Sequence, residues 1–351
     1  MDLDTKLWNG KRVLITGHTG FKGAWLSALI HYFGGEVVGI SLPPEKPNSL
    51  YTDAQINDLM SKEYFGNICD KSLVERVFSE TEFDYVFHLA AQALVRKSVM
   101  NPIDTFETNV LGTANLIVSA LASKSILGVL VATTDKVYKN NDLKRSFVES
   151  DSFGGRDPYS ASKASSELIL HSLRESCNPG FIPVTSVRAG NVIGGGDWGI
   201  DRLVPDIVRA CISNSPLEIR NPEATRPWQF ILDCLQGYLL VAQTHLLKTA
   251  NQHGSFNFGA QDSTSVMELI HNFELSFGAK IQCSFVSSPI HEQQYLALNT
   301  SLAEEALGWR RRYDQIESVH RTANWYAKFN QGTDAYDLIL EDFRDFGFRG
   351  D

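Results

Sequence analysis

The sequence predicts an α/β fold in which a doubly wound parallel sheet is joined to a smaller C-terminal α+β domain. In the first half, short apolar segments rich in β-branched residues alternate with helical patterns. Such strands, separated by amphipathic helices, are typical of a parallel sheet covered on both faces. A glycine-rich turn directly follows the first apolar segment, and the alternation weakens after residue 190. These observations favour one large sheet domain and a second, less regular one.

The elements can be placed in order from these patterns. Strands are expected at 12–16, 36–40, 85–91 and 127–133, because these segments are short and apolar. Helices are expected at 21–33, 71–79, 104–123 and 158–176, where apolar residues recur at helical spacing. The clearest helices of the second half are expected at 266–277 and 301–307. The final stretch, 334–351, fits either a docked helix or a mobile tail.

Domain boundaries follow from the change in composition. Glycine, proline and tryptophan become frequent after residue 190. We expect a first domain over residues 1–189, with segments near 229–260 returning to it. A second domain, mainly for binding substrate, is expected over residues 190–345.

The composition limits the class of protein. Hydrophobic residues make up 43% of the 351 residues and charged residues 21%, which is ordinary for a soluble globular protein. The net charge of −9 without a basic run argues against a nucleic-acid partner. No apolar segment is long enough for a membrane span, and the N-terminus lacks the pattern of a secretory signal. Five scattered cysteines favour neither disulfides nor a metal site, so we expect a cytoplasmic protein without a metal.

The glycine-rich turn predicts a Rossmann-like dinucleotide site. Glycines in a G-x-x-G-x-x-G spacing let the backbone turn tightly and approach a pyrophosphate, which rests on the N-terminus of the following helix. The second strand ends at Ser41 without an acidic residue, and no arginine stands nearby to bind a 2′-phosphate, so NAD is favoured over NADP. The residues of the turn are Gly17, Thr19, Gly20, Phe21, Lys22 and Gly23.

A second cluster predicts proton transfer. Tyr159 and Lys163 are four residues apart and therefore share one helix face. A lysine ammonium and a cationic nicotinamide near the phenol would lower the pKa of the tyrosine from about 10. Such a tyrosine can take a proton from a sugar hydroxyl while a hydride leaves the same carbon. Thr134 ends a predicted strand and is expected in the same site.

These motifs resemble the extended short-chain dehydrogenase/reductase family, which contains nucleotide-sugar epimerases and dehydratases. The resemblance extends from Trp8 to Tyr326 and is most specific to the CDP-glucose 4,6-dehydratase branch. It rests on T-G-H-T-G-F-K-G from Thr16, on T-D-K from Thr134, on R-A-G-N-V-I-G-G-G-D-W from Arg188 and on R-P-W-Q from Arg226. It implies further NAD contacts at Asn67, Ile68, Leu89, Ala90, Ala91, Gln92 and Asn109, besides Tyr159 and Lys163.

Asp135 and Lys136 favour a dehydratase over an epimerase, because only elimination needs a second acid and base. Once carbon 4 of the sugar is a ketone, Lys136 would remove the carbon 5 proton and Asp135 would protonate the departing carbon 6 hydroxyl. NAD would take a hydride from carbon 4, with Tyr159 as base and Thr134 on the same oxygen, and would return it to carbon 6. This cycle needs a protonated Asp135 and a neutral Lys136, hence pKa values shifted in opposite senses.

The second half is expected to bind the nucleotide sugar. Guanidinium groups match phosphate oxygens, and backbone amides near Asn191 can approach a diphosphate. The candidates are Asn191, Arg202, Arg220, Arg226, His291 and Tyr295. Two residues depart from the family pattern: Asn67 stands where an aspartate reads adenine, and Phe230 stands where a histidine is usual.

Other interpretations remain open at this point. A dehydratase or epimerase for another nucleotide sugar fits the same scaffold, and so does a non-catalytic NAD-binding sensor. A homodimer or homotetramer is expected, because the helices at 104–123 and 158–176 resemble those that form a dimer interface in the family. We expect Leu111, Ile117 and Leu170 on their outward faces, although these apolar residues could equally well pack against the sheet.

Overall fold

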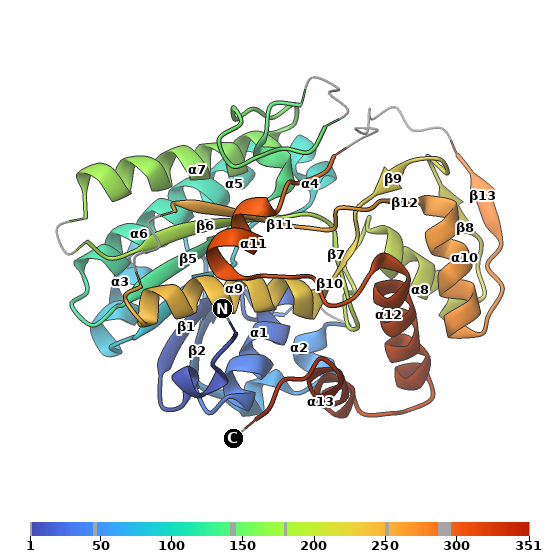
Figure 1. Ribbon diagram of the computed structural model, residues 1–351, viewed down its shortest axis with the longest axis horizontal. Helices are drawn as coiled ribbons and strands as arrows, with labels where there is room; N and C mark the ends of the chain where they lie inside the picture. Colours follow the sequence, from blue (N-terminus) through green and yellow to red (C-terminus); the bar gives the residue numbers. More distant parts are fainter. Residues whose placement is uncertain are drawn as a thin grey trace.

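The computed structural model describes residues 2–44, 48–140, 145–178, 181–249, 253–286 and 296–350. Seven parallel strands form the central sheet in the order β11-β6-β5-β4-β1-β2-β3 (Figure 1). Between β1 and β4 the order of winding reverses, and ligands of such sheets bind outside the carboxyl ends of the strands at that point. The strands are β1 (Arg12–Thr16), β2 (Glu36–Ser41), β3 (Met60–Phe65), β4 (Tyr85–His88), β5 (Gly128–Ala132), β6 (Val184–Ala189) and β11 (Ser255–Phe258).

Helices cover both faces of the sheet because successive strand residues point to opposite sides. In β1, Val13 and Ile15 join the core under α1 (Phe21–Tyr32) and α9 (Ile231–Leu246). Leu14 joins the other core, under α3 (Lys71–Glu80), α6 (Thr113–Ala122) and α7 (Pro158–Ser176). The expected helix at 104–123 is a continuous run of α5 (Pro102–Phe106), the π-helical turn η3 (Glu107–Gly112) and α6.

Short elements fill the loops of this sheet domain. They are η1 (Thr5–Trp8), α2 (Leu50–Asp53), η2 (Ile56–Leu59), α4 (Val95–Met100) and η4 (Asp135–Val137). Of these, α4 and η4 follow β4 and β5 and thus start at the carboxyl edge of the sheet. Of the seven strands of the sheet, β3, β6 and β11 lie outside the segments that the sequence patterns predicted as strands.

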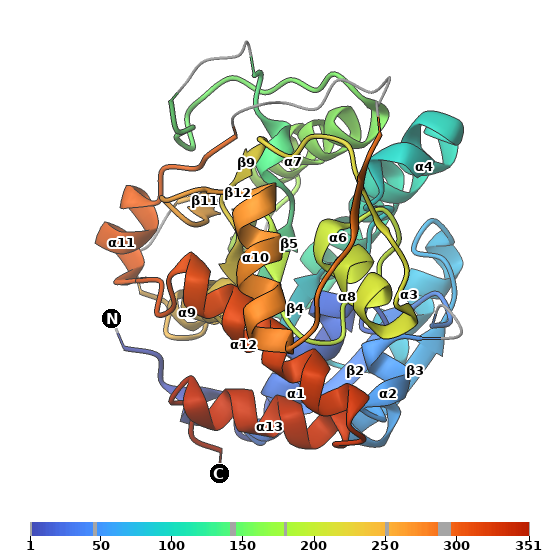
Figure 2. The same ribbon diagram turned by 90° about the vertical axis from the view of Figure 1, so that its right-hand side faces the viewer.

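The second region lies beside the carboxyl edge of the sheet (Figure 2). It contains three two-stranded pairs, formed by β7 (Val192–Ile193) with β10 (Gln229–Phe230), β8 (Leu217–Ile219) with β13 (Cys283–Phe285), and β9 (Thr225–Arg226) with β12 (Thr264–Ser265). Its helices are α8 (Leu203–Ser213), α10 (Val266–Phe277) and α12 (Gln315–Asn330), whereas α11 (Ser301–Leu307) packs against β11 and α9 of the sheet domain. Ser265 and Glu268 form a capping box that starts α10.

The C-terminal stretch is a docked helix, which decides the alternative that the sequence left open. Helix α13 (Ala335–Asp345) packs against α1 (Figures 1 and 2). The ring of Phe343 lies 5.8 Å from that of Trp25 and 5.2 Å from that of Tyr32, measured between centroids. The amphipathic pattern of α13 therefore buries aromatic surface that α1 would otherwise expose.

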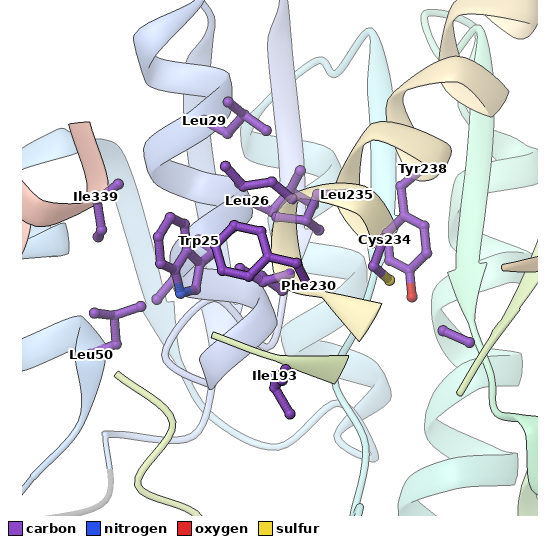
Figure 3. Close-up of a cluster of buried hydrophobic side chains, with 14 of the residues drawn as sticks. Trp25, Leu26, Leu29, Leu50, Ile193, Phe230, Cys234, Leu235, Tyr238 and Ile339 are labelled. Atoms are coloured by element: carbon purple, nitrogen blue, oxygen red, sulfur yellow. The ribbon is translucent and has the colours of Figure 1, made fainter. Parts of the chain in front are cut away.

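Phe230, one of the departures from the family pattern, belongs to the core. Its side chain is fully buried, and Figure 3 places its ring among Trp25, Leu26 and Leu235. Because Phe230 is enclosed by apolar side chains, it does not face a nucleotide. Among the described residues, no helix is both long and apolar enough to cross a membrane.

Candidate functional site

The glycine-rich turn follows β1 and opens α1, and its shape requires glycine. Gly17 has a φ of 75°, and a Cβ at this position would lie 2.8 Å from the backbone nitrogen of Ala90. A Cβ on Gly23 would lie 2.1 Å from the carbonyl oxygen of Gly17. Gly20 occupies the N-cap position of α1, and Phe21 and Lys22 are the first residues of that helix. The turn therefore packs closely and begins a helix, which is the geometry that binds a pyrophosphate.

The segment after β4 forms a second wall of this cradle. The hydroxyl of Thr16 accepts hydrogen bonds from the backbone nitrogens of Leu89 (3.2 Å) and Ala90 (3.1 Å). Farther on, the side chain of Asn109 accepts from the backbone nitrogen of Gln92 at 2.8 Å and donates to its carbonyl at 3.0 Å. The segment from Leu89 through Ala91 to Gln92 is thus fixed at both ends, close to the glycine turn.

The outer residues of the expected cofactor site lie at the ends of β2 and β3. The hydroxyls of Thr19 and Ser41 are hydrogen-bonded at 2.7 Å, which ties the glycine turn to the end of β2. The side-chain oxygen of Asn67 accepts from the backbone nitrogen of Cys69 at 2.9 Å. Ile68 is buried in the core under α3 and α6. The family's aspartate position is therefore occupied by an asparagine whose oxygen stabilises its own turn.

The strand β5 delivers three polar residues to one point. Thr134 caps η4, and its hydroxyl donates to Oδ1 of Asp135 at 3.0 Å. The ammonium of Lys136 donates to the same oxygen at 2.9 Å. Asp135 is 2% exposed and Lys136 is 33% exposed, so the pair has one buried and one accessible end. The structure brings these three predicted residues together.

Tyr159 stands on the first turn of α7, directly beside this pair. Asp157 caps α7 by accepting from the backbone nitrogen of Ser160 at 2.9 Å, and Pro158 occupies the first helical position. Burial raises the pKa of Tyr159, while the charge of Lys136 and a hydrogen bond with Thr134 lower it. Without a bound cofactor, desolvation of the phenolate therefore outweighs its cationic neighbours. The lowered pKa that we expect beside a cationic nicotinamide stays a prediction.

Lys163 lies one turn farther along α7. Its ammonium donates to the carbonyl oxygen of Ala132, the last residue of β5, at 3.0 Å. Burial lowers the pKa of Lys163 to about 8, helped by the positive charge of Lys22 and opposed by Glu167. The charge of Lys22, the second residue of α1, thus acts on the ammonium of Lys163.

Asp135 and Lys136 form an ion pair in the free site. Burial acts to lower the pKa of Lys136, but the charges of Asp135 and Tyr159 oppose it, and the pKa ends above its ordinary value. The neutral lysine that the cycle needs when ligands are bound stays a prediction. The geometry is that of an ion pair joined by one short hydrogen bond.

A buried network beneath the site was missed by the sequence interpretation. Glu167 accepts hydrogen bonds from Thr133, Ser186 and both the Nε and Nη2 atoms of Arg188, at 2.6–3.0 Å. Glu167 and Arg188 are 2% and 3% exposed. The network joins β5, β6 and α7 directly behind Thr134 and Lys163. Glu167 follows Lys163 by four residues, and that spacing was the only signal available for it.

The substrate candidates of the second region approach the same point. Arg226 lies near enough to Lys136 for its charge to lower that lysine's pKa, and Arg202 acts likewise on Tyr159. A Cβ on Gly190 would lie 3.6 Å from Oδ2 of Asp135 and 3.7 Å from the Pro227 carbonyl. The R-P-W-Q segment therefore adjoins the Asp135 carboxylate.

The remaining candidates have more varied positions. The carbonyl oxygen of Asn191 accepts from the backbone nitrogen of Gln229 at 2.9 Å, which joins the long glycine motif to the R-P-W-Q segment. Arg220 forms an ion pair with Asp201 at 3.3 Å. His291 and Tyr295 lie outside the described residues.

Comparisons with known proteins agree with this arrangement. A profile of the family described as GDP-mannose 4,6 dehydratase matches residues 14–322. The CDP-glucose 4,6-dehydratase of Salmonella typhimurium is 39% identical over 342 residues, which cover 95% of each chain. A dTDP-glucose 4,6-dehydratase from Streptomyces venezuelae, solved with NAD bound, superposes with a TM-score of 0.78 at 25% identity, over 90% of this chain and 97% of the other.

The fold is shared with epimerases as well. The UDP-glucose 4-epimerase of Thermotoga maritima, solved with UDP-glucose, has a TM-score of 0.79 at 22% identity, over 91% of this chain and 99% of the other. At that identity the likeness concerns the fold alone. The match of the family profile covers most of the sequence, including the glycine turn, the T-D-K turn and Tyr159. The chain belongs to the GDP-mannose 4,6 dehydratase family, a group of NAD-dependent epimerases and dehydratases.

Proposed function

We propose that the protein is a hydro-lyase that converts CDP-glucose to CDP-4-keto-6-deoxyglucose with tightly bound NAD, for deoxysugar or surface-polysaccharide synthesis. The observation that carries this proposal is the Asp135–Lys136 pair beside Tyr159, because an epimerase has no use for a second acid and base. The full-length similarity to a CDP-glucose 4,6-dehydratase supports both the reaction and the nucleotide.

The residues at the glycine turn fit NAD. Gly17 and Gly23 leave room only for backbone, and Gly20 starts the helix whose amides would face the pyrophosphate. Ser41 and Thr19 would lie beside the adenosine ribose, without an arginine among the candidates for a 2′-phosphate. Bound NAD would supply the hydride acceptor and, later in the same cycle, the hydride donor. The cofactor would therefore show no net change.

Tyr159 would act as the base at carbon 4. Its raised pKa means that the phenol is protonated in the free site, so ionisation must be favoured when ligands bind. Three groups supply that help: the hydrogen bond from Thr134 and the positive charges of Lys136 and Arg202. Thr134 would also hydrogen-bond the oxygen that becomes the ketone.

The Asp135–Lys136 ion pair can still supply the acid and base that elimination needs. The ammonium of Lys136 donates to Oδ1 of Asp135 across a 2.9 Å hydrogen bond, along which a proton can pass. Moving that proton from Lys136 to Asp135 yields a neutral lysine and a protonated carboxyl, without exchange with solvent. Lys136 would then remove the carbon 5 proton, and Asp135 would give its proton to the departing hydroxyl. The ion pair is therefore the resting form of the required acid and base.

The second region would bind the nucleotide and its diphosphate. Arg226 is favoured for a phosphate because it lies near Lys136, and Arg202 because it lies near Tyr159. Asn191, Arg220, His291 and Tyr295 complete the proposed contacts. Residues 1–189, together with 229–260, would form the NAD-binding domain, and residues 190–345 would mainly form the substrate-binding domain. Five free cysteines support a cytoplasmic location.

A homodimer or homotetramer is proposed from the surface of α4 to α7. These helices form one surface, since α4, α5 and α6 each contact α7. Their exposed faces carry Val99, Met100, Ile103, Leu111, Val118 and Leu168, each at least 49% exposed. Of the interface residues expected from sequence, only Leu111 lies on this surface. Ile117 and Leu170 are fully buried against the sheet, so that assignment was wrong. Light scattering should give at least a dimer, and Leu168→Glu should give the monomer.

The activity test is incubation of the purified protein with CDP-glucose, watching alkali-induced absorbance of the 4-keto product and the loss of one water by mass. Product from CDP-glucose, and not from the UDP, GDP or dTDP analogues, would support the proposal. Elimination from another nucleotide sugar, or its epimerisation, would overturn the substrate or the reaction. A protein with bound NAD that turns over none of them would be the sensor.

A further inference from the structure

A charge cluster joins Arg220, already a proposed substrate contact, to two residues that the proposed function does not use. It consists of Arg96 on α4, Asp201 before α8, and Arg220 directly after β8. The Asp201 Oδ1 atom lies 2.7 Å from Nη1 of Arg96 and 3.3 Å from Nη2 of Arg220. Two guanidinium groups from separate regions of the chain thus converge on one carboxylate oxygen.

The cluster is connected to the proposed active site on both sides. Two residues after Arg96, the hydroxyl of Ser98 accepts from the backbone nitrogen of Tyr159 at 3.1 Å. Next to Asp201 in the chain, Arg202 is close enough to Tyr159 to lower its pKa. Arg96 and Asp201 are thus close neighbours in the chain of two residues that act on Tyr159, Ser98 and Arg202.

Asp201 has the properties of a replaceable anion. Its φ of 60° is uncommon for a residue other than glycine, and its carboxylate bonds to both guanidiniums in this conformation. The side chains of Arg96, Arg220 and Asp201 are 39%, 28% and 29% exposed. Ion pairs at this exposure are weak, so a ligand with a higher charge can displace the carboxylate. A diphosphate offers several oxygens to the guanidinium groups of Arg96 and Arg220.

We propose that Asp201 holds the place of the substrate's diphosphate between Arg96 and Arg220, and that Arg96 is a further specificity-determining residue. On binding, the diphosphate replaces the Asp201 carboxylate and draws α4 and the end of β8 onto the ligand. This inference rests on the proposed nucleotide-sugar substrate and adds Arg96 and the competing carboxylate to it. The affinity for substrate therefore depends partly on the ion pairs of Asp201, which must first be broken.

The experiment measures initial rates against CDP-glucose, and inhibition by CDP, in the NAD-loaded full-length enzyme. We expect Arg96→Gln to raise KM and the CDP inhibition constant about tenfold with little change in kcat, because one charge-assisted contact is lost. Arg96→Lys should recover part of the affinity, since it keeps the charge without the fork. Asp201→Asn should lower both constants about threefold, because the internal competitor loses its charge while its size is kept.

The double variant separates competition from a structural role. If Asp201 acts only by competing for Arg96 and Arg220, the Asn substitution should improve binding less once Arg96 is replaced. Glu36→Gln is the matched control, because it breaks an exposed arginine pair with Arg12 that lies far from the site. It should leave both constants unchanged.

Two results would overturn the inference. A higher KM and a lower melting temperature in Asp201→Asn would make the cluster a structural clamp. Unchanged CDP inhibition in Arg96→Gln, with normal inhibition of the unmodified enzyme, would remove Arg96 from the site while the proposed function stands. An unmodified protein that binds no nucleoside diphosphate would instead contradict the proposed function itself.

Discussion

The ion pairs on the two sides of the candidate site differ in how deeply they are buried. On the sheet side, Glu167 and Arg188 form an ion pair with exposed fractions of only 2% and 3%. On the opposite side, Arg96, Asp201 and Arg220 are 28–39% exposed. A buried pair cannot lose one partner without a large penalty, whereas an exposed pair contributes little and exchanges easily. We infer that the ion pair on the proposed proton-transfer side keeps its partners, whereas a ligand can replace a partner in the ion pairs on the proposed ligand-binding side.

The strongest test of the proposed proton-transfer side is Tyr159→Phe. The variant keeps the ring but loses the proton acceptor at carbon 4, so kcat should fall by about 10²–10⁴-fold. Turnover of CDP-glucose measures the effect, and bound NAD measured after denaturation shows whether the cofactor site survives. Tyr336→Phe on α13 is the control and should retain full activity. A Tyr159→Phe enzyme with more than a tenth of the normal rate would place the base elsewhere.

Asp135→Asn tests the proposed proton transfer between Lys136 and Asp135. Elimination should fall by about 10²-fold, because the acid is lost and Lys136 has no partner to take its proton. The pKa of Lys136 should also fall, since burial lowers it and the opposing charge of Asp135 is gone. A neutral lysine is then populated at lower pH, so the rising limb of kcat against pH should move to lower pH.

The Asp135→Asn profile is compared with that of Asp58→Asn, which changes an aspartate outside the site. That control should keep the normal rate and the normal pH profile. Unchanged elimination in Asp135→Asn would refute the acid role proposed for this residue.

Glu167→Gln tests whether burial is what fixes the sheet side. It leaves the Arg188 guanidinium without its carboxylate, so the free energy of unfolding should fall by about 3–5 kcal/mol. Glu36→Gln breaks an exposed pair, whose side chains are 43% and 51% exposed, and should cost about 0–1 kcal/mol. Urea unfolding followed by circular dichroism measures both variants. Equal losses would remove the contrast between buried and exposed pairs.

A further test concerns a buried carboxyl away from the site. Burial raises the pKa of Asp342 on α13 to about 8 from its ordinary 3.8, and the Arg321 charge only partly opposes this. Because the folded state keeps this proton up to higher pH, its contribution to stability is present below 3.8 and is lost as the pH rises to about 8. Asp342→Asn should flatten the loss of melting temperature between pH 5 and 8.

For that comparison, Asp337→Asn replaces an exposed aspartate on the same helix. Its melting temperature should follow the pH dependence of the unmodified protein. A pH dependence that survives in Asp342→Asn would assign the loss of stability to another group.

Much of the fold was predictable because its signals are local. The ranges expected for α7, α10 and α11 agree with the structure, since Pro158, the Ser265 capping box and Gly308 mark their ends. Strand β3 was missed because its residues are mostly polar or exposed at the sheet edge. The docking of α13 could not be predicted from the sequence either, because it depends on contacts with aromatic residues of α1, which is far away in the chain.

The candidate site divides in the same way. Thr134, Asp135 and Lys136 are consecutive, so their proximity to one another needs no tertiary information. The roles of Arg96 and Asp201 could not be inferred, because 105 positions separate the two partners of that ion pair. Nor could the sequence distinguish Leu111 from Ile117 and Leu170, which share helical patterns but differ in what covers them.

The sequence by itself determined the glycine turn, the T-D-K turn and the tyrosine helix, because backbone sterics and capping residues act over a few positions. Only the tertiary structure decided the burial and the charged neighbours of Tyr159 and Lys136, and the partners of the surface arginines. Burial and Coulomb interactions depend on groups that the chain brings together from separate elements. For this reason the family motifs predicted which residues meet, while the folded protein determined their surroundings.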